Sequence, residues 1–312
     1  MNNAIATLTI GCVVLAGGCD KGSKKPQAAP ETTQGSPDKA SAPKRRPTAR
    51  VVKKGVGVVK LWTTGSLDVP ESVQYDPARK VLYVSCINGK PTEKNGKGYI
   101  AKVSLVGKLV AQKWATGFDA PKGMGLAGDT LYVTDITRLH AVDTRTGKIK
   151  KTVTAPESKF LNDIAIGPKG EVYVSDMITG MIHVLKGGKL VTFVNLKGFK
   201  GSNGMLLQDG ALLVGTATGI VRVTLPDGKA SLYVRVSGFG MIDGLKAYGA
   251  DSYLMSNWKG RTQLVSRAGK VTVLLDTTAK KIQSADFEYV PDQRMLIIPT
   301  FFHNKVVAYR IR

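Results

Sequence analysis

A set of oxygen-bearing side chains recurs at one position of a repeated sequence pattern. Six segments share this pattern, which is a short polar or glycine-containing anchor, a strand, a turn and a second strand that ends in a small or polar residue. The segments begin at Pro70, Pro121, Leu161, Ser202, Ile242 and Ser284. Their second residues, called the anchor residues below, are Glu71, Lys122, Asn162, Asn203, Asp243 and Ala285.

Four of the anchor residues predict a metal site. Two carboxylates, Glu71 and Asp243, and two amides, Asn162 and Asn203, form a mixture that suits a hard divalent cation, with water completing its shell. We expect one ion, Ca2+, with Zn2+, Mg2+ and Mn2+ as alternatives. Zn2+ normally prefers His or Cys, and the three histidines, His140, His183 and His303, show no ligand spacing. The alternative is that Asn and Asp stand at strand starts for turn geometry alone.

The repeats themselves predict the elements that would bring the anchor residues together. Each continues with a third strand, a glycine-containing turn such as KGGK or PDGK, and a fourth strand. The strands are rich in Val, Ile, Leu and Tyr, and no segment has a convincing helical period. Six repeats of four strands predict an all-β, six-bladed β-propeller over residues 56–312, with a solenoid as the competitor. In a propeller the anchor residues would converge near the axis, on one face.

The two ends of this region predict that the ring is closed. Residues 56–62 resemble a fourth strand, since Trp62 and Gly65 match Trp114 and Gly117 in the first repeat. The last repeat ends in HNKVVAYRIR and has no fourth strand of its own. The N-terminal strand can therefore complete the final blade, which removes the exposed sheet edges of an open arrangement.

These motifs also carry a family resemblance. The order and spacing of Pro-Glu-Ser, Leu-Asn-Asp, Ser-Asn-Gly and Ile-Asp-Gly resemble the regucalcin/gluconolactonase family and the related diisopropyl fluorophosphatase. The resemblance implies a six-bladed propeller with a divalent metal in its tunnel, held by Glu71, Asn203 and Asp243. It implies that Asn162 is a fourth ligand or binds substrate or metal-bound water. It also implies hydrolysis of sugar lactones or related esters.

Catalytic and substrate roles follow from that resemblance. The metal would polarise a lactone or ester carbonyl, and Asp243 would stay ionised and activate a water. Lactonases often carry an Arg two residues before Asn162, where this chain has Phe160, so we expect Phe160, Asn162 and Lys122 to contact substrate. Lys122 could bind an anionic group of the substrate or pair with Asp163 or Asp286. The long insertion Asn88–Gly98 is either a mobile lid or a tolerated surface loop.

The N-terminal region predicts export. Residues 1–18 form the predicted signal, in which residues 4–18 are apolar with small residues before Cys19, and this resembles a bacterial lipoprotein signal whose Cys becomes the lipidated N-terminus. The alternative is a plain cleaved signal, since residues 1–3 lack Lys and Arg. Residues 19–55 are rich in Pro, Ala, Ser, Thr and Lys and have no aromatic residue, which predicts a linker. We therefore expect a lipid-anchored protein on the periplasmic side of a bacterial membrane.

Charge and cysteine content limit the remaining possibilities. The net charge is +22, from 45 Lys and Arg against 23 Asp and Glu, but the basic residues are scattered beside turns rather than gathered in one stripe. This disfavours nucleic-acid binding and fits a solvated basic surface near an anionic envelope. Cys86 sits in a predicted strand as a small buried hydrophobe. We expect a monomer with a small-molecule substrate or ligand, and the basic charge would suit an anionic one.

The sequence is compatible with two classes of function. The first is a metal-dependent hydrolase of a lactone or small ester. The second is a non-enzymatic, membrane-tethered propeller that binds a ligand or a protein and keeps the metal as a structural element.

Overall fold

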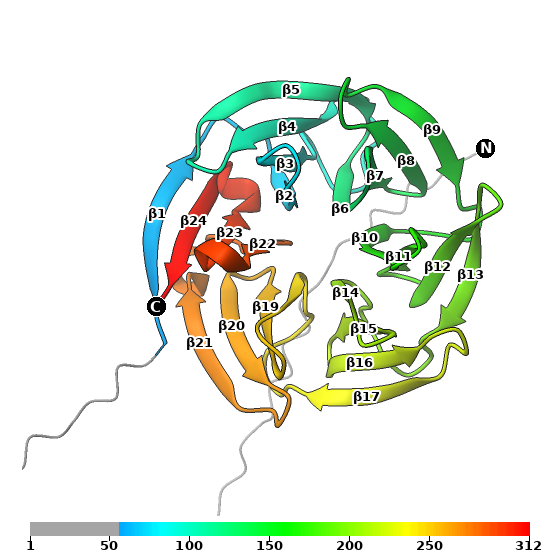
Figure 1. Ribbon diagram of the computed structural model, residues 1–312, viewed down its shortest axis with the longest axis vertical. Helices are drawn as coiled ribbons and strands as arrows, with labels where there is room; N and C mark the ends of the chain where they lie inside the picture. The colour runs from blue at the N-terminus through cyan, green and yellow to red at the C-terminus, as the bar shows by residue number, and fades with distance from the viewer. Residues whose placement is uncertain (1–55) are drawn as a thin grey trace, which may run out of the picture. The chain divides into compact units, whose positions relative to one another are not determined.

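The computed structural model describes residues 56–312, which fold as a six-bladed β-propeller (Figure 1). Each blade is a four-stranded antiparallel sheet whose first strand lies innermost. The fold class predicted from the repeats is therefore confirmed. Three single turns of 3-10 helix interrupt the strands, and they are η1 (Thr278–Lys280), η2 (Pro291–Gln293) and η3 (Phe301–His303).

The first three blades follow the chain without a break. Blade 1 consists of β2 (Pro70–Asp76), β3 (Val81–Cys86), β4 (Gly98–Ser104) and β5 (Leu109–Phe118). Blade 2 consists of β6 (Pro121–Ala127), β7 (Thr130–Asp135), β8 (Arg138–Asp143) and β9 (Ile149–Thr154). Blade 3 consists of β10 (Leu161–Ile166), β11 (Val172–Asp176), β12 (Met181–Lys186) and β13 (Lys189–Asn195).

The other three blades complete the circle. Blade 4 consists of β14 (Met205–Gln208), β15 (Ala211–Thr216), β16 (Gly219–Thr224) and β17 (Ala230–Arg235). Blade 5 consists of β18 (Leu245–Ala247), β19 (Ser252–Asn257), β20 (Arg261–Ser266) and β21 (Val271–Asp276). Blade 6 consists of β22 (Glu288–Val290), β23 (Met295–Pro299), β24 (Val306–Ile311) and β1 (Val58–Thr64).

Strand β1 closes the ring, as its sequence predicts. It pairs antiparallel with β24, from Val58 opposite Ile311 to Thr64 opposite Val306. In Figure 1 the blue β1 lies along the outer side of the red β24. The Trp62 side chain adds a second attachment, because its Nε1 donates to the Leu105 carbonyl oxygen in blade 1 at 2.9 Å. The first strand of the domain therefore joins the last blade to the first.

The apolar core is divided among the blade interfaces. Six clusters of buried side chains each combine residues from two neighbouring blades, and together they cover all six interfaces. Cys86 belongs to the cluster between blades 1 and 6, where burial raises the pKa of its thiol. It is a buried hydrophobe, as expected, and a poor thiolate at neutral pH.

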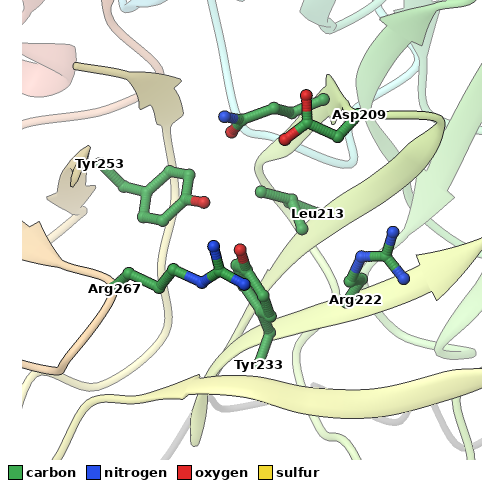
Figure 2. Close-up of a pocket in the computed structure, with 7 residues that line it drawn as sticks. Asp209, Leu213, Arg222, Tyr233, Tyr253 and Arg267 are labelled. Carbon is green, nitrogen blue, oxygen red and sulfur yellow. The ribbon is translucent and has the colours of Figure 1, made fainter. Parts of the chain in front are cut away.

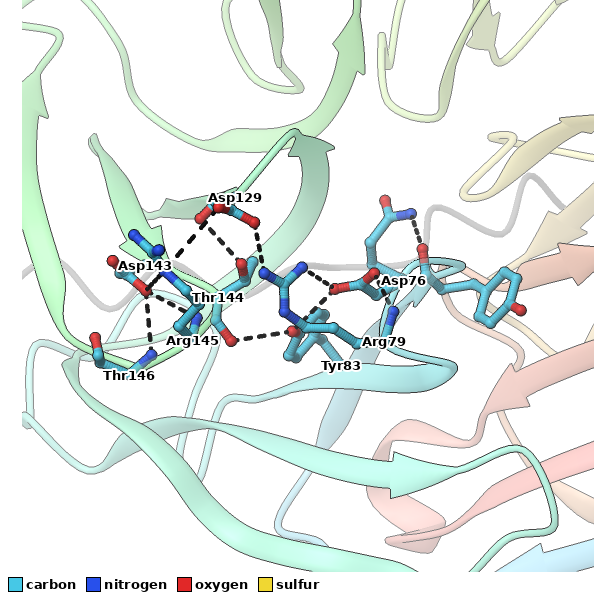
Figure 3. Close-up of polar contacts among 10 residues, drawn as sticks. Asp76, Arg79, Tyr83, Asp129, Asp143, Thr144, Arg145 and Thr146 are labelled. Carbon is cyan, nitrogen blue, oxygen red and sulfur yellow. Dashed lines mark hydrogen bonds and ion pairs between the residues drawn. The ribbon is translucent and has the colours of Figure 1, made fainter.

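Polar contacts also join blades on the face away from the anchor residues. Between blades 1 and 2, Arg79 donates to Asp76 at 3.1 Å and to Asp129 at 2.5 Å (Figure 3). Tyr83 donates to the same Asp76 carboxylate at 3.2 Å. This network links the β2–β3 turn of one blade to the β6–β7 turn of the next.

Within the described residues, no helix is long and apolar enough to cross a membrane.

Candidate functional site

The six anchor residues meet around the axis on one face of the propeller. Glu71, Lys122 and Asn162 are the second residues of β2, β6 and β10. Asn203 and Asp243 each stand two residues before their innermost strand, β14 and β18. All six anchor residues, including Ala285, are buried. The repeat alignment therefore identified structurally equivalent positions.

Close approach of the innermost strands explains the glycine that follows several anchor residues. A Cβ atom added at Gly204 would lie 2.3 Å from the Asp243 carbonyl oxygen, and one at Gly123 would lie 2.4 Å from the Asn162 carbonyl oxygen. Neither distance is possible for a real side chain, so these positions must stay glycine for adjacent blades to meet. The Gly of the Ser-Asn-Gly motif thus sets how near the anchor residues of blades 4 and 5 lie.

Three of the predicted metal ligands are connected in the structure. The Asn203 side-chain amide donates to Asp243 Oδ1 at 2.7 Å. The amide nitrogens of Asn162 and Asn203 each lie 3.9 Å from Met177 Sδ, which follows β11. Met177 therefore holds both amides by their nitrogen ends. It was missed from the sequence, because a methionine after a strand carries no signal of a site.

The oxygen ends of these side chains fit a cation. Glu71 Oε2, Asn162 Oδ1 and Asn203 Oδ1 are buried and have no hydrogen-bond partner within residues 56–312. A buried acceptor without a donor is costly, and a bound cation would satisfy several at once. The donor set of carboxylate and amide oxygens is the kind that calcium takes. Among the described residues, no three His, Cys, Asp or Glu side chains form a metal-binding group, so this set depends on its two asparagines.

The carboxylates of the site influence one another strongly. Burial raises the pKa of Glu71 well above its ordinary value, and the charges of Asp243 and Asp286 raise it further. Burial and Asp286 raise the pKa of Asp243 to about 7, against the hydrogen bond from Asn203, which lowers it. In the metal-free state Asp243 is therefore about half protonated near neutral pH. A cation at the site would favour the ionised form of both groups.

The Lys122 side chain, for which the sequence allowed either a substrate contact or an ion pair, is buried near the Phe160 ring. It is 1% exposed, and its Nζ donates to the Ala120 carbonyl oxygen at 2.8 Å and lies 4.5 Å from the centre of the Phe160 ring. Within the described chain it forms no ion pair with Asp163 or Asp286. Burial lowers the pKa of Lys122 to about 8, while Glu71 raises it. Lys122 and Phe160 therefore form a cation–π contact beside the ring of oxygens.

A second polar layer lies directly beneath the anchor residues. Asp286 Oδ2 accepts a hydrogen bond from the Ser72 hydroxyl at 2.6 Å, and Asp163 Oδ2 accepts one from the Met205 amide at 2.5 Å. Burial lowers the pKa of Lys246, but the negative charges of Asp286, Glu288 and Asp163 together raise it above its ordinary value. The layer was not predicted as a unit. Its sequence signal is the acid directly after an anchor residue, as in Asn162-Asp163 and Ala285-Asp286.

Two predicted features remain, the insertion Asn88–Gly98 and the N-terminal region. The insertion Asn88–Gly98 lies between β3 and β4, on the anchor face, and internal hydrogen bonds such as Asn88 Nδ2 to the Lys97 carbonyl oxygen hold it. Its role as a lid stays a prediction. Cys19, the signal segment 1–18 and the linker 19–55 lie outside the described residues.

Comparison with known proteins defines the class of fold. No protein-family model matches the sequence, and no curated protein matches it. Among solved structures, a gluconolactonase from Xanthomonas campestris is 12% identical, with a TM-score of 0.65 over 82% of this chain and 90% of that chain. A streptogramin B lyase is 12% identical, with a TM-score of 0.61 over 82% and 98%.

A third solved structure extends the likeness. A catalytically inactive virginiamycin B lyase from Staphylococcus aureus with quinupristin is 13% identical, with a TM-score of 0.56 over 82% of this chain and 100% of that chain. At identities this low, the three structures establish that the chain shares their propeller fold and nothing further.

Proposed function

We propose that the protein is a divalent-metal-dependent hydrolase of a lactone or small ester, with its site at the anchor residues. The observation that carries the proposal is the set of three buried oxygens without a partner among residues 56–312, from Glu71, Asn162 and Asn203, of which Asn203 is hydrogen-bonded to Asp243. The gluconolactonase among the similar folds supports the substrate class, and the two lyases support an enzyme on this architecture.

The chain's own residues would divide the work as follows. Glu71, Asn162, Asn203 and Asp243 would hold the ion, and calcium is the ion that best suits their oxygens. A bound divalent cation supplies Lewis acidity that polarises a carbonyl group. Asp243 would accept a proton from the attacking water, and the Asn203 amide would keep its carboxylate oriented. Lys122 lies close enough to Glu71 to affect its ionisation and would favour an anionic substrate group.

One observation favours the second candidate, a ligand-binding propeller with a structural metal. Lys122 is buried, its ammonium group donates to the Ala120 carbonyl oxygen, and it lies over the ring of Phe160, the residue that stands where lactonases often have a substrate-binding Arg. A site with that group withdrawn could bind a ligand without turning it over. Both candidates share the metal and differ only in turnover.

Calorimetry and an activity panel separate these possibilities. The purified protein should bind calcium, and calcium should raise its melting temperature because the ion binds the folded state. Asp243→Asn should weaken calcium binding at least tenfold and abolish turnover of lactones even at saturating calcium. Asp292→Asn, an exposed acid in η2, is the matched control and should change neither quantity.

The outcomes are distinct for each part of the proposal. A protein that binds calcium but hydrolyses no lactone or ester would support the binding propeller. A protein that binds no divalent cation, or binds one equally well after Asp243→Asn, would contradict the metal site.

We also propose that the propeller is exported and held at a membrane by lipid on Cys19. The support is the sequence of residues 1–55 alone.

A further inference from the structure

A cavity lies between blades 4 and 5, away from the anchor residues. Its volume is about 370 Å3, and its lining residues are Gln208, Asp209, Leu213, Arg222, Tyr233, Tyr253 and Arg267 (Figure 2). β14 begins beside Asn203 and ends at Gln208, so the cavity lies at the opposite end of the blade, roughly 15 Å along the strand from the anchor residues. This volume is within the range of small-molecule sites.

Two arginines, Arg222 and Arg267, line the cavity together with one carboxylate, Asp209, so positive charge is in excess. Arg222 forms no hydrogen bond or ion pair through its side chain with any residue of 56–312. Arg267 has a single ion pair in this region, to Asp251 at 3.7 Å, and both side chains are mostly exposed. Such a pair contributes little and competes weakly with a ligand. The guanidinium groups are therefore available to an anion.

The aromatic residues fix the shape of the cavity. The Arg267 guanidinium lies 5.3 Å from the centre of the Tyr233 ring, and the Tyr233 and Tyr253 rings are 6.3 Å apart at 69°. Burial raises the pKa of the Tyr253 hydroxyl, and the Tyr233 hydroxyl raises it further. The Tyr253 hydroxyl therefore stays protonated at neutral pH and can donate a hydrogen bond. Figure 2 shows Tyr253 and Arg267 on the same side of the cavity.

Gln208 supplies a hydrogen-bond acceptor to the cavity. Its Nε2 donates to the Ala250 carbonyl oxygen across the blade interface at 3.5 Å, which directs the amide. Its Oε1 is buried and has no partner within the described part of the chain. An acceptor in that state calls for a ligand that brings a hydrogen-bond donor.

We propose that this cavity binds a small carboxylate that also bears a hydroxyl group. The carboxylate accepts hydrogen bonds from Arg267 and Tyr253, since a guanidinium group matches a carboxylate in geometry and charge, and Arg222 adds a second positive charge on the other side of the cavity (Figure 2). The hydroxyl donates to Gln208 Oε1, and the carbon skeleton contacts Leu213 and the tyrosine rings. Opening of a lactone yields compounds of this class, but binding in the cavity does not depend on the activity proposed for the anchor residues.

Isothermal titration calorimetry of the full chain in EDTA tests the proposal. The probes are gluconate and 4-hydroxybenzoate, with benzoate as the counterpart without a hydroxyl group. We expect at least one hydroxylated probe to bind, and Arg222→Gln and Arg267→Gln each to weaken it roughly tenfold or more. Gln208→Leu should weaken 4-hydroxybenzoate and leave benzoate unchanged. Arg310→Gln, an exposed arginine on β24, is the matched control and should have no effect.

The location of binding is tested by Asp243→Asn, which should leave the affinity for the probe unchanged. Loss of binding in that variant would place the ligand at the anchor residues and overturn the proposal. Failure of both hydroxylated probes to bind, or equal affinity after both arginine substitutions, would also overturn it. Arg222→Gln is decisive if Arg267→Gln destabilises the fold, because the Arg222 head group has no partner to lose.

Discussion

Asp243 links the ionisation of the anchor site to the stability of the whole propeller. Its pKa in the folded, metal-free protein is about 7, raised first by burial and then by Asp286. In an unfolded chain an aspartate titrates near pH 4. The folded state therefore holds a proton that the unfolded state has lost between about pH 4 and pH 7. Stability from this group is complete below that window and is lost as the pH rises through it.

The first prediction is that protein without bound metal loses stability between about pH 4 and pH 7, and that Asp243→Asn flattens this loss. Asparagine cannot ionise, so the substitution removes the cost of a buried charge at the higher pH. In EDTA, the fall in melting temperature from the lower to the higher pH should be smaller in the variant than in the wild type, by roughly 3 °C or more. Glu71 keeps part of the slope, because its pKa is raised in the same direction. Identical slopes would contradict the buried, proton-binding Asp243.

The second prediction concerns Lys122 as an internal competitor of the cation. Its ammonium group acts electrostatically on Glu71, and it lowers the pKa of that carboxylate. Lys122→Met keeps the length of the side chain and removes the charge, so calcium binding should tighten by roughly tenfold. Calorimetry measures this directly. Lys197→Met, on the exposed surface, should change nothing. Weaker calcium binding in Lys122→Met would mean that Lys122 stabilises the site rather than opposing the ion.

Between elements, the contact of blades 4 and 5 decides how the anchor residues meet. Our third prediction is that Gly204→Ala costs about 1–3 kcal/mol of folding stability and weakens calcium binding, since its Cβ would lie 2.3 Å from the Asp243 carbonyl oxygen. The blades must separate to accept it, which moves Asp243 away from Asn203. Chemical denaturation and calorimetry measure the two effects. Gly65→Ala, where an added Cβ meets nothing within 4 Å, is the control.

The fourth prediction concerns the closing strand. A chain that lacks residues 1–55 keeps all of β1 and should melt at the same temperature as the full chain. A chain that lacks residues 1–64 loses β1, the Trp62 hydrogen bond to Leu105 and the pairing with β24, and exposes strand edges. Its melting temperature should fall by roughly 10 °C or more. Equal melting temperatures for the two truncations would show that β1 contributes little to closure.

The elements were predictable from sequence because each repeats. Strand periodicity and glycine turns recur in every blade, so the pattern in one segment confirms the next, and the absent fourth strand of the last repeat points to residues 56–62. The anchor residues were found in the same way, by position. Met177, Lys246 and the cavity of blades 4 and 5 escaped this reasoning, because each occurs once and depends on contacts between blades.

For the whole molecule, the positive net charge and the proposed lipid on Cys19 are two separate ways of binding a membrane. The chain carries a net charge of +22, enough for attraction to an anionic surface without any lipid. Such attraction is screened by salt, whereas a lipid anchor is not. A high-salt wash of the membrane fraction therefore distinguishes the two routes.

The last prediction is that Cys19→Ser releases the protein from washed membranes while the propeller stays folded. Serine cannot take the lipid, and residues 56–312 contain all six blades, so the melting temperature of the propeller should not change. The wild type should stay in the membrane fraction after a wash with about 1 M salt, where the screening length is only about 3 Å. Release of the wild type by the same wash would show that charge holds it, and the plain cleaved signal would then be the better interpretation. Retention of Cys19→Ser after the wash would require an attachment other than Cys19, with the apolar segment 4–18 left uncleaved as the first to examine.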